Sequence, residues 1–254
     1  MNIVFIGSGN VATHLAIAFK AMGADITQVW SNDHRNAEIL AALTKAEPIN
    51  DLDALDQTAD YYIIAVKDDA IAAVAGQLQE VRGIVLHTSG ATAIDVLKGA
   101  GTGYGVLYPL QTFSKTKAVD LKSVPFCIEA NSTDTLEKIS AIAHLLSTSV
   151  AEVSSGQRKV LHLAAVFACN FTNHLYHLSH QLLEAHQLKF DLLKPLIMET
   201  AQKIQSAAPK EVQTGPAVRN DQQTIDKHLA LLTGSPELQQ IYEMLSSSIR
   251  KSSL

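Results

Sequence analysis

Apolar and polar positions alternate in a regular way along the first 150 residues. Residues 2–6 form a continuous apolar run, as a strand buried on both faces of a sheet requires, and residues 11–22 carry apolar groups at helical spacing. The same reasoning predicts strands at 26–30, 61–66, 83–87, 104–108, 124–129 and 150–153, and helices at 36–45, 69–80, 92–98 and 133–147. Strands that alternate with helices indicate an α/β fold with a doubly wound, parallel sheet.

The pattern changes at the segment Ser154-Ser155-Gly156. Residues 157–187 contain no Gly or Pro and read as one long helix, and further helices fit 189–207, 221–233 and 236–250. No convincing strand follows residue 154. We therefore predict an α/β domain at 1–154 and an all-helical domain at 155–254, which would serve substrate binding and dimerisation.

Composition excludes several classes of protein. Charged residues make up 18% of the chain and hydrophobic residues 47%, which is typical of a well-packed globular protein. The net charge of −5 and the lack of a Lys- or Arg-rich block argue against a nucleic-acid partner. No apolar run approaches the roughly 18 residues that span a membrane, and the first residues lack the features of a signal peptide. Two cysteines, Cys127 and Cys169, do not make a disulfide framework, so we expect a reducing, cytoplasmic location.

The first predicted strand leads into a glycine-rich turn. Residues 7–12, Gly-Ser-Gly-Asn-Val-Ala, fit the pattern G-x-G-x-x-G/A between a buried strand and an amphipathic helix. Gly7 permits the tight turn, Gly9 lets a pyrophosphate approach the backbone, and the helix N-terminus offers free N–H groups. The alternative is a tight turn without a ligand. The context favours a Rossmann-type dinucleotide-binding domain, with contacts from Gly7, Ser8, Gly9, Asn10 and Val11.

The end of the second predicted strand bears on the choice between NAD and NADP. An NAD enzyme usually has an acid there to bind the ribose 2′-hydroxyl, whereas this chain has Ser31. Ser31, Asn32 and Arg35 could hold a 2′-phosphate, although Asp33 would favour NAD if it pointed inward. We therefore expect NADP, with NAD possible. At the ends of later strands, the predicted cofactor contacts are Ala65, Val66 and Ser89, and Asp68 or Asp69 is expected to cap the next helix.

Several segments carry a resemblance to a known family. They are 87–91 (HTSGA), 108–113 (YPLQTF), 162–165 (HLAA) with Asn170, and 214–221 (TGPAVRND) with His228. The chain resembles a bacterial family of oxidoreductases with a Rossmann-like domain and a C-terminal helical domain of unknown function. More distantly it is similar to pyrroline-5-carboxylate reductase, ketopantoate reductase, hydroxyisobutyrate dehydrogenase and the deazaflavin-dependent NADP oxidoreductases, whose helical domains are of the 6-phosphogluconate dehydrogenase C-terminal type. The family usually has His before Pro109 and Gly before Asp221, where this chain has Tyr108 and Asn220.

The long predicted helix carries a polar stripe. At 100° per residue, one side of the helix collects Lys159, His162, Val166, Cys169 or Asn170, Asn173 and His177. This stripe either faces solvent or lines a cleft. The resemblance implies that a Lys and an Asn of this helix face the nicotinamide, which makes Lys159 and Asn170 candidates. Because imidazole exchanges protons near neutral pH, His162 is a candidate proton donor, against the alternative of a hydrogen-bonded core histidine.

The segment 214–228 is the last candidate site. Gly215-Pro216 breaks the chain and can start a helix, and Arg219 offers a planar fork suited to a carboxylate or phosphate. Asp221 could instead pair with Arg219 or cap a helix. Resemblance to pyrroline-5-carboxylate reductase assigns this segment to substrate binding or a dimer interface. The predicted substrate contacts are Gln111, Arg219, Asp221, Thr224 and His228.

Other chemistries find no support in the sequence. His174, His177 and His180 are spaced so that three ligands do not converge on one helix face, and we predict no metal. Two functions remain. The first is an NADP-dependent oxidoreductase, a homodimer, that transfers hydride to or from a small polar, anionic carbonyl, imine or hydroxy compound. The second is a non-catalytic dinucleotide-binding or sensor protein with the same fold.

Overall fold

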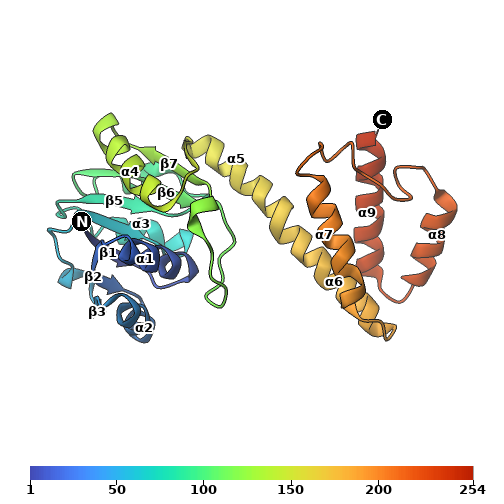
Figure 1. The fold of residues 1–254 in the computed structure, drawn as a ribbon, viewed down its shortest axis with the longest axis horizontal. Coiled ribbons are helices and arrows are strands. Elements are labelled where there is room, and N and C mark those ends of the chain that lie inside the picture. The colour runs from blue at the N-terminus through green and yellow to red at the C-terminus, as the bar shows by residue number, and fades with distance from the viewer. Residues whose placement is uncertain (254) are drawn as a thin grey trace. The chain divides into compact units, whose positions relative to one another are not determined.

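The computed structural model describes residues 1–253 and divides into two compact units (Figure 1). The first unit runs from Met1 to Asn170 and the second begins at Phe171. The first is a Rossmann-like α/β unit and the second is helical, so the predicted fold class is confirmed.

A single eight-stranded sheet forms the first unit, in the order β3-β2-β1-β4-β5-β6-β7-β8. Strands β1 to β6 run parallel to one another, β7 is antiparallel to β6, and β8 is parallel to β7. The prediction of a parallel sheet was therefore wrong for β7 and β8, which run against the other six strands. The segment between β6 and β7 contains only a 3-10 turn, and without a crossover helix the chain returns in the opposite direction. The strands are β1 (Asn2–Ile6), β2 (Asp25–Trp30), β3 (Glu47–Ile49), β4 (Tyr61–Ile64), β5 (Ile84–His87), β6 (Gly103–Pro109), β7 (Phe126–Ala130) and β8 (Val150–Glu152).

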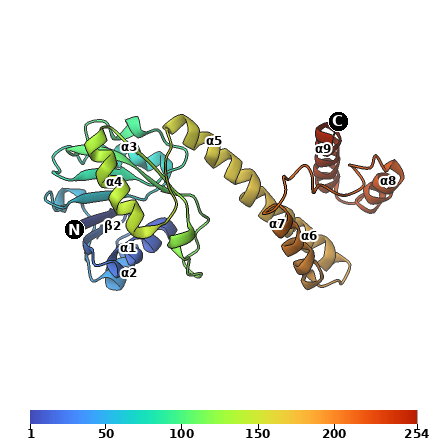
Figure 2. The same ribbon diagram turned by 45° about the horizontal axis from the view of Figure 1, so that its top comes forward.

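Helices cover both faces of this sheet. One face packs against α1 (Asn10–Ala21), α2 (His34–Thr44) and α4 (Thr133–Leu146), which lie together on that side in Figure 2. The other face packs against α3 (Ile71–Ala75) and the 3-10 turns η1 (Leu52–Ala54) and η3 (Ile94–Leu97). Helix α3 is much shorter than the predicted 69–80 because Gly76, a poor helix former, follows it directly.

The predicted long helix is continuous in the chain but not uniformly α-helical. It consists of α5 (Ser155–Ala165), a π-helical segment η5 (Val166–Phe171) and α6 (Thr172–Ala185). A capping box between Ser154 and Gln157 starts α5 at the predicted change of pattern. The compact units nevertheless divide at Asn170, beyond the expected boundary at 154, because Arg158 and Leu161 of α5 pack onto the α/β unit.

The second unit contains the remaining helices. They are η6 (Phe190–Leu193), α7 (Lys194–Lys203), α8 (Gln222–Leu231) and α9 (Pro236–Ser253). Between residues 171 and 253 no strand is present, as predicted. None of the helices within residues 1–253 combines the length and the hydrophobicity that crossing a lipid bilayer demands.

Candidate active site

A cleft of about 820 Å³ opens in the first unit where the parallel strands end. Its walls come from the carboxyl ends of β1, β2, β4, β5 and β6 and from α5. The strand order reverses between β1 and β4, and open α/β sheets bind their ligands at such a switch point. The volume lies within the roughly 300–1,000 Å³ typical of small-molecule sites.

The glycine turn lines this cleft. Gly7 has a φ of +118°, and a Cβ there would lie 2.3 Å from the carbonyl oxygen of Ala65, so only glycine fits. Gly9 also lines the cleft, but a Cβ there would meet no atom within 4 Å. Helix α1 starts at the next residue, Asn10, and its first N–H groups are free for a ligand. The turn can therefore accept an anion against its backbone, as the motif predicts.

The end of β2 brings polar side chains to the same cleft. Ser8, Ser31, Asn32, Asp33 and Asn36 all line it, and the Ser8 hydroxyl donates a 2.9 Å hydrogen bond to Ser31 Oγ. The carboxylate of Asp33 caps α2, because it accepts hydrogen bonds from the Arg35 backbone N–H and from Asn36 Nδ2. Arg35 itself is exposed and is not among the residues that line the cleft.

The ends of β4 and β5 place the other predicted cofactor contacts. Ala65, Val66 and Ser89 line the cleft together with Val11. The predicted capping role of Asp68 or Asp69 was wrong: both lie inside the 3-10 turn η2 (Asp68–Ala70), and no side chain caps it. Asp68 lines the cleft beside Lys67.

Tyr108 and His162 form a polar pair on the wall of the cleft. The Tyr108 hydroxyl lies 3.2 Å from His162 Nδ1, and both residues line the cleft. A Cβ on Gly90 would lie 2.7 Å from that nitrogen and 2.8 Å from Cζ of the tyrosine ring, so glycine is required below the pair. Burial, with a smaller contribution from Cys127, raises the pKa of Tyr108, and its phenol therefore keeps its proton at neutral pH.

The other two candidates on the long helix lie elsewhere. Lys159 and Asn170 are exposed and do not line the cleft. Lys159 and Arg158 lie three and four residues before His162, so both are close to its side of α5, but Arg158 is buried whereas Lys159 is exposed. Asn170 belongs to the π-helical segment, whose wider turn shifts every later residue off the stripe that a regular α-helix would form.

Of the predicted substrate contacts, only Gln111 lines this cleft. Its side-chain oxygen accepts a hydrogen bond from the Thr112 N–H. The other four belong to the second unit. Asp221 caps α8 through the backbone N–H and hydroxyl of Thr224, Arg219 is exposed, and His228 Nδ1 lies 2.8 Å from the Tyr242 hydroxyl.

Sequence reasoning missed a buried ion pair beside the cleft. The side chain of Arg158 is fully buried and binds the carboxylate of Glu129 on β7. The sequence does carry a signal for this pair, because Arg158 lies one helical turn before His162. Periodicity alone, however, favoured the neighbouring Lys159 as the candidate. Tyr108 was missed as a candidate because the family usually has His at that position.

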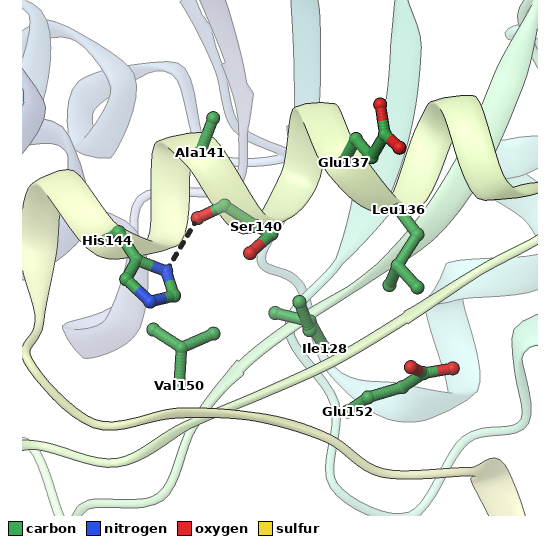
Figure 3. Close-up of a pocket in the computed structure, with 8 residues that line it drawn as sticks. All are labelled: Ile128, Leu136, Glu137, Ser140, Ala141, His144, Val150 and Glu152. Atoms are coloured by element: carbon green, nitrogen blue, oxygen red, sulfur yellow. Dashed lines mark hydrogen bonds between the residues drawn. The ribbon is translucent and has the colours of Figure 1, made fainter.

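No group of three or more metal-ligating side chains occurs within residues 1–253. A second hollow of about 530 Å³ lies between α4 and the strands β7 and β8 (Figure 3). Figure 3 shows His144 turned back onto Ser140, and the Nδ1 to carbonyl distance is 3.0 Å. The hollow shares no lining residue with the cleft, and its two carboxylates, Glu137 and Glu152, do not suit an anionic cofactor.

Comparisons with known proteins agree with this architecture. Residues 2–89 match the family model described as NADP oxidoreductase, coenzyme F420-dependent, and residues 124–249 match a domain of unknown function, DUF2520. No match was found among curated proteins.

Solved structures provide closer relatives. The putative NADP oxidoreductase BF3122 from Bacteroides fragilis is 45% identical over 98% of both chains, with a TM-score of 0.92. Protein TM1727 from Thermotoga maritima is 23% identical over 99% of both chains, with a TM-score of 0.82. An imine reductase from Myxococcus stipitatus, solved with NADP+, is 17% identical over 99% of this chain and 94% of its own, with a TM-score of 0.72. The last two show the fold alone, whereas the identity with BF3122 shows that this chain belongs to the family of NADP oxidoreductases in which a Rossmann-like domain precedes a DUF2520 domain.

Proposed function

We propose that this protein is an NADP-dependent oxidoreductase that transfers hydride between a nicotinamide and a small polar, anionic carbonyl, imine or hydroxy compound. The observation that carries the proposal is the shared cleft: the glycine turn and the Tyr108–His162 pair line the same hollow. A dinucleotide sensor would need the turn but would have no use for a proton-donating pair beside it. The geometry therefore favours the enzyme over the non-catalytic alternative.

The residues of the cleft fit the implied cofactor. Gly7 and Gly9 leave the backbone open to a pyrophosphate, and the N-terminus of α1 supplies N–H donors and a positive dipole end. Ser31, Asn32 and Asn36 supply neutral donors at the end of β2, where a 2′-phosphate would be held, while the Asp33 carboxylate is occupied as a helix cap. These contacts support NADP over NAD.

Hydride transfer also needs a proton donor. Bound NADPH supplies a hydride to the carbon of a C=O or C=N bond, and the oxygen or nitrogen of that bond must gain a proton. The Tyr108 hydroxyl is protonated at neutral pH and contacts His162, so Tyr108 can give its proton to the substrate and regain one from solvent through the partly exposed imidazole of His162. In the reverse direction the same pair accepts the proton that a hydroxy compound loses.

The remaining candidates keep supporting roles in this proposal. Gln111 would orient the substrate from the cleft wall. Lys159 and Asn170 stay predictions that the exposed positions of these residues do not favour. Arg219 of the helical domain at 155–254 stays the proposed anion clamp, and Thr224 and His228 stay predicted substrate contacts.

A turnover assay tests the proposed function. Purified protein is incubated with NADPH and a panel of cyclic imines, keto acids and small aldehydes, and loss of nicotinamide absorbance is followed. We expect turnover with at least one compound, and a loss of about 100-fold or more in Tyr108→Phe, because a general acid contributes a factor of this size. NADPH binding without turnover of any compound would instead support the sensor.

We further propose that the protein is a homodimer. Among the described residues after Asn170, only Ala217, Ile225 and Ser246 are buried. Large apolar side chains of this unit, including those of Leu192, Leu196 and Met198, are exposed. Helices with so little buried surface need a further surface to pack against, and a second copy would supply it symmetrically.

The composition of the chain is the basis for the cellular location and the partners that we propose. Cys127 and Cys169 are both free, which suits the reducing cytoplasm. The negative net charge argues against a nucleic-acid partner.

A further inference from the structure

Arg158 is buried in the α/β unit although it carries a charge. Its side chain is 0% exposed, and it is the largest of the fully buried side chains. A buried charge is costly unless it is paired and fully hydrogen-bonded. Arg158 meets this requirement with donors on all three of its nitrogens: to the carboxylate of Glu129, to the carbonyl oxygens of Ser89 and Thr92, and to the Ser155 hydroxyl.

Glu129 completes the network from the sheet. Its carboxylate also accepts hydrogen bonds from the Ser155 backbone N–H at 2.9 Å and from the Ser155 hydroxyl at 2.7 Å. Burial by itself would raise the pKa of Glu129, but the hydrogen bonds from Arg158 and Ser155 outweigh it and lower that pKa. The pair is therefore ionised at neutral pH and ties the first turn of α5 to β7.

The network connects the three segments that build the polar pair of the cleft. Arg158 lies one turn before His162 on the same side of α5. Ser89 and Thr92 lie on either side of Gly90 in the chain, and the rings of Tyr108 and His162 pack closely against Gly90. Tyr108 is paired in register with Cys127, two residues before Glu129 on β7.

We infer that the buried Arg158–Glu129 pair is a positioning element that sets His162 against Tyr108 and holds the Ser89–Thr92 turn at the wall of the cofactor cleft. The inference rests on the proposed function for its role in turnover, because it assigns these residues to the same site. Neither residue lines the cleft, so they act through their neighbours and not on a substrate. The planar guanidinium is essential to this role, since it reaches two carbonyl oxygens and a carboxylate at fixed angles.

The test uses the full-length protein with the pair replaced by apolar residues, Arg158→Met with Glu129→Leu. Replacing both partners removes the charges together, so the variant avoids an unpaired buried ion and retains packing. Arg158→Lys is the second variant, which keeps the charge but loses the fork. Arg82→Met, at an exposed arginine of the same unit, is the matched control.

Two measurements are made on each variant. The first is the NMR signal of the His162 ring nitrogens and the Tyr108 Cζ carbon, assigned by their loss in His162→Ala and Tyr108→Phe. The second is kcat and KM for NADPH. We expect both NMR signals to move in the double variant and in Arg158→Lys, and kcat to fall about 100-fold while KM changes far less, because misplacing a reacting group by about 1 Å has this effect.

Unchanged His162 and Tyr108 signals, with kcat within about twofold of the original protein, would overturn the inference and leave the pair a structural contact. If the double variant fails to fold, Arg158→Lys decides by the same two measurements. Should the original protein turn over no substrate, the proposed function fails, yet the NMR signals still decide whether Arg158 sets the contact between His162 and Tyr108.

Discussion

The Tyr108 hydroxyl and His162 Nδ1 lie 3.2 Å apart although 54 residues separate them in the chain. One comes from β6 and the other from α5, and Gly90 in the turn after β5 leaves just enough room for both rings. The pair is therefore a product of three separate segments that meet at one end of the sheet. We therefore expect any change that separates these segments to alter turnover in the cleft.

The first prediction concerns Gly90→Ala. The new methyl group would lie 2.7 Å from His162 Nδ1 and 2.8 Å from Tyr108 Cζ, so at least one ring has to move. We expect kcat/KM to fall about 100-fold, as for other small displacements of reacting groups, while NADPH still binds. Steady-state kinetics and an NADPH titration check this.

Gly156→Ala is the matched control for that change. Gly156 lies in the first turn of α5, and a Cβ there would meet no atom within 4 Å. Replacing glycine by alanine reduces the conformational entropy of the unfolded chain. We therefore expect the free energy of unfolding to rise by about 0.5–1 kcal/mol and the kinetics to stay unchanged. A Gly90→Ala variant with the kinetics of this control would show that the pair is not needed.

The second prediction separates the two glycines of the turn. Gly7→Ala combines a positive φ with a 2.3 Å approach to the Ala65 carbonyl oxygen, so we expect it to destabilise the fold by about 2 kcal/mol or more. Gly9→Ala meets no protein atom and should fold normally. It should nevertheless weaken NADPH binding about tenfold or more, because its methyl group occupies the space that a pyrophosphate needs. Normal NADPH affinity in Gly9→Ala would place the cofactor elsewhere.

The third prediction addresses the choice of cofactor. Asn36 lines the cleft next to the N-terminus of α2. Asn36→Asp adds a negative charge where a 2′-phosphate would lie, so we expect NADPH affinity to fall about tenfold and NADH affinity to stay within about twofold. Fluorescence titration with both cofactors measures the ratio. Equal losses for the two would argue against a 2′-phosphate at this position.

The fold could be predicted from the sequence wherever the signal is local. The strands and helices of the α/β unit follow from runs of apolar residues, and the glycine turn from a motif of six consecutive residues. Strand β3 was missed because it has three residues, one of them Pro48. The antiparallel β7 depends on how a long loop returns to the sheet, and the π-helical segment follows no periodic signal.

The site shows the same division between local and distant contacts. The predicted cofactor contacts at the strand ends follow from the sheet topology, and most of them line the cleft. Arg158 and Glu129 are 29 residues apart, and no spacing rule links a strand residue to a helix residue at that distance. A helical wheel can show which of Arg158 and Lys159 faces the sheet only when the side of α5 that packs on the sheet is known.

The fourth prediction concerns pH and stability. Burial, with a smaller effect from the Arg158 cation, lowers the pKa of His87 from 6.5 to about 4. Below pH 6.5 the unfolded chain therefore binds a proton that the folded protein does not, and stability falls as the pH drops toward 4. We expect His87 to account for a loss of about 2 kcal/mol between pH 7 and pH 5.

Urea unfolding at both pH values measures this loss, with His87→Gln as the comparison. The variant cannot take up a proton at this position, so its stability should change less between pH 7 and pH 5 than that of the original protein. An equal change in the two proteins would mean that His87 is not buried in the neutral form.

The fifth prediction tests the proposed homodimer through one leucine of the helical unit. Leu196 on α7 is 61% exposed, and we propose that a second copy covers it. Leu196→Asp would place a charge in that interface, and an unpaired buried charge opposes association. Light scattering should give twice the chain mass of 27.4 kDa for the original protein and the mass of one chain for the variant. Leu43→Asp is the control, because Leu43 on α2 is 59% exposed and lies on the α/β unit. It should remain dimeric, whereas a monomeric original protein, or equal behaviour of the two variants, would contradict an interface on α7.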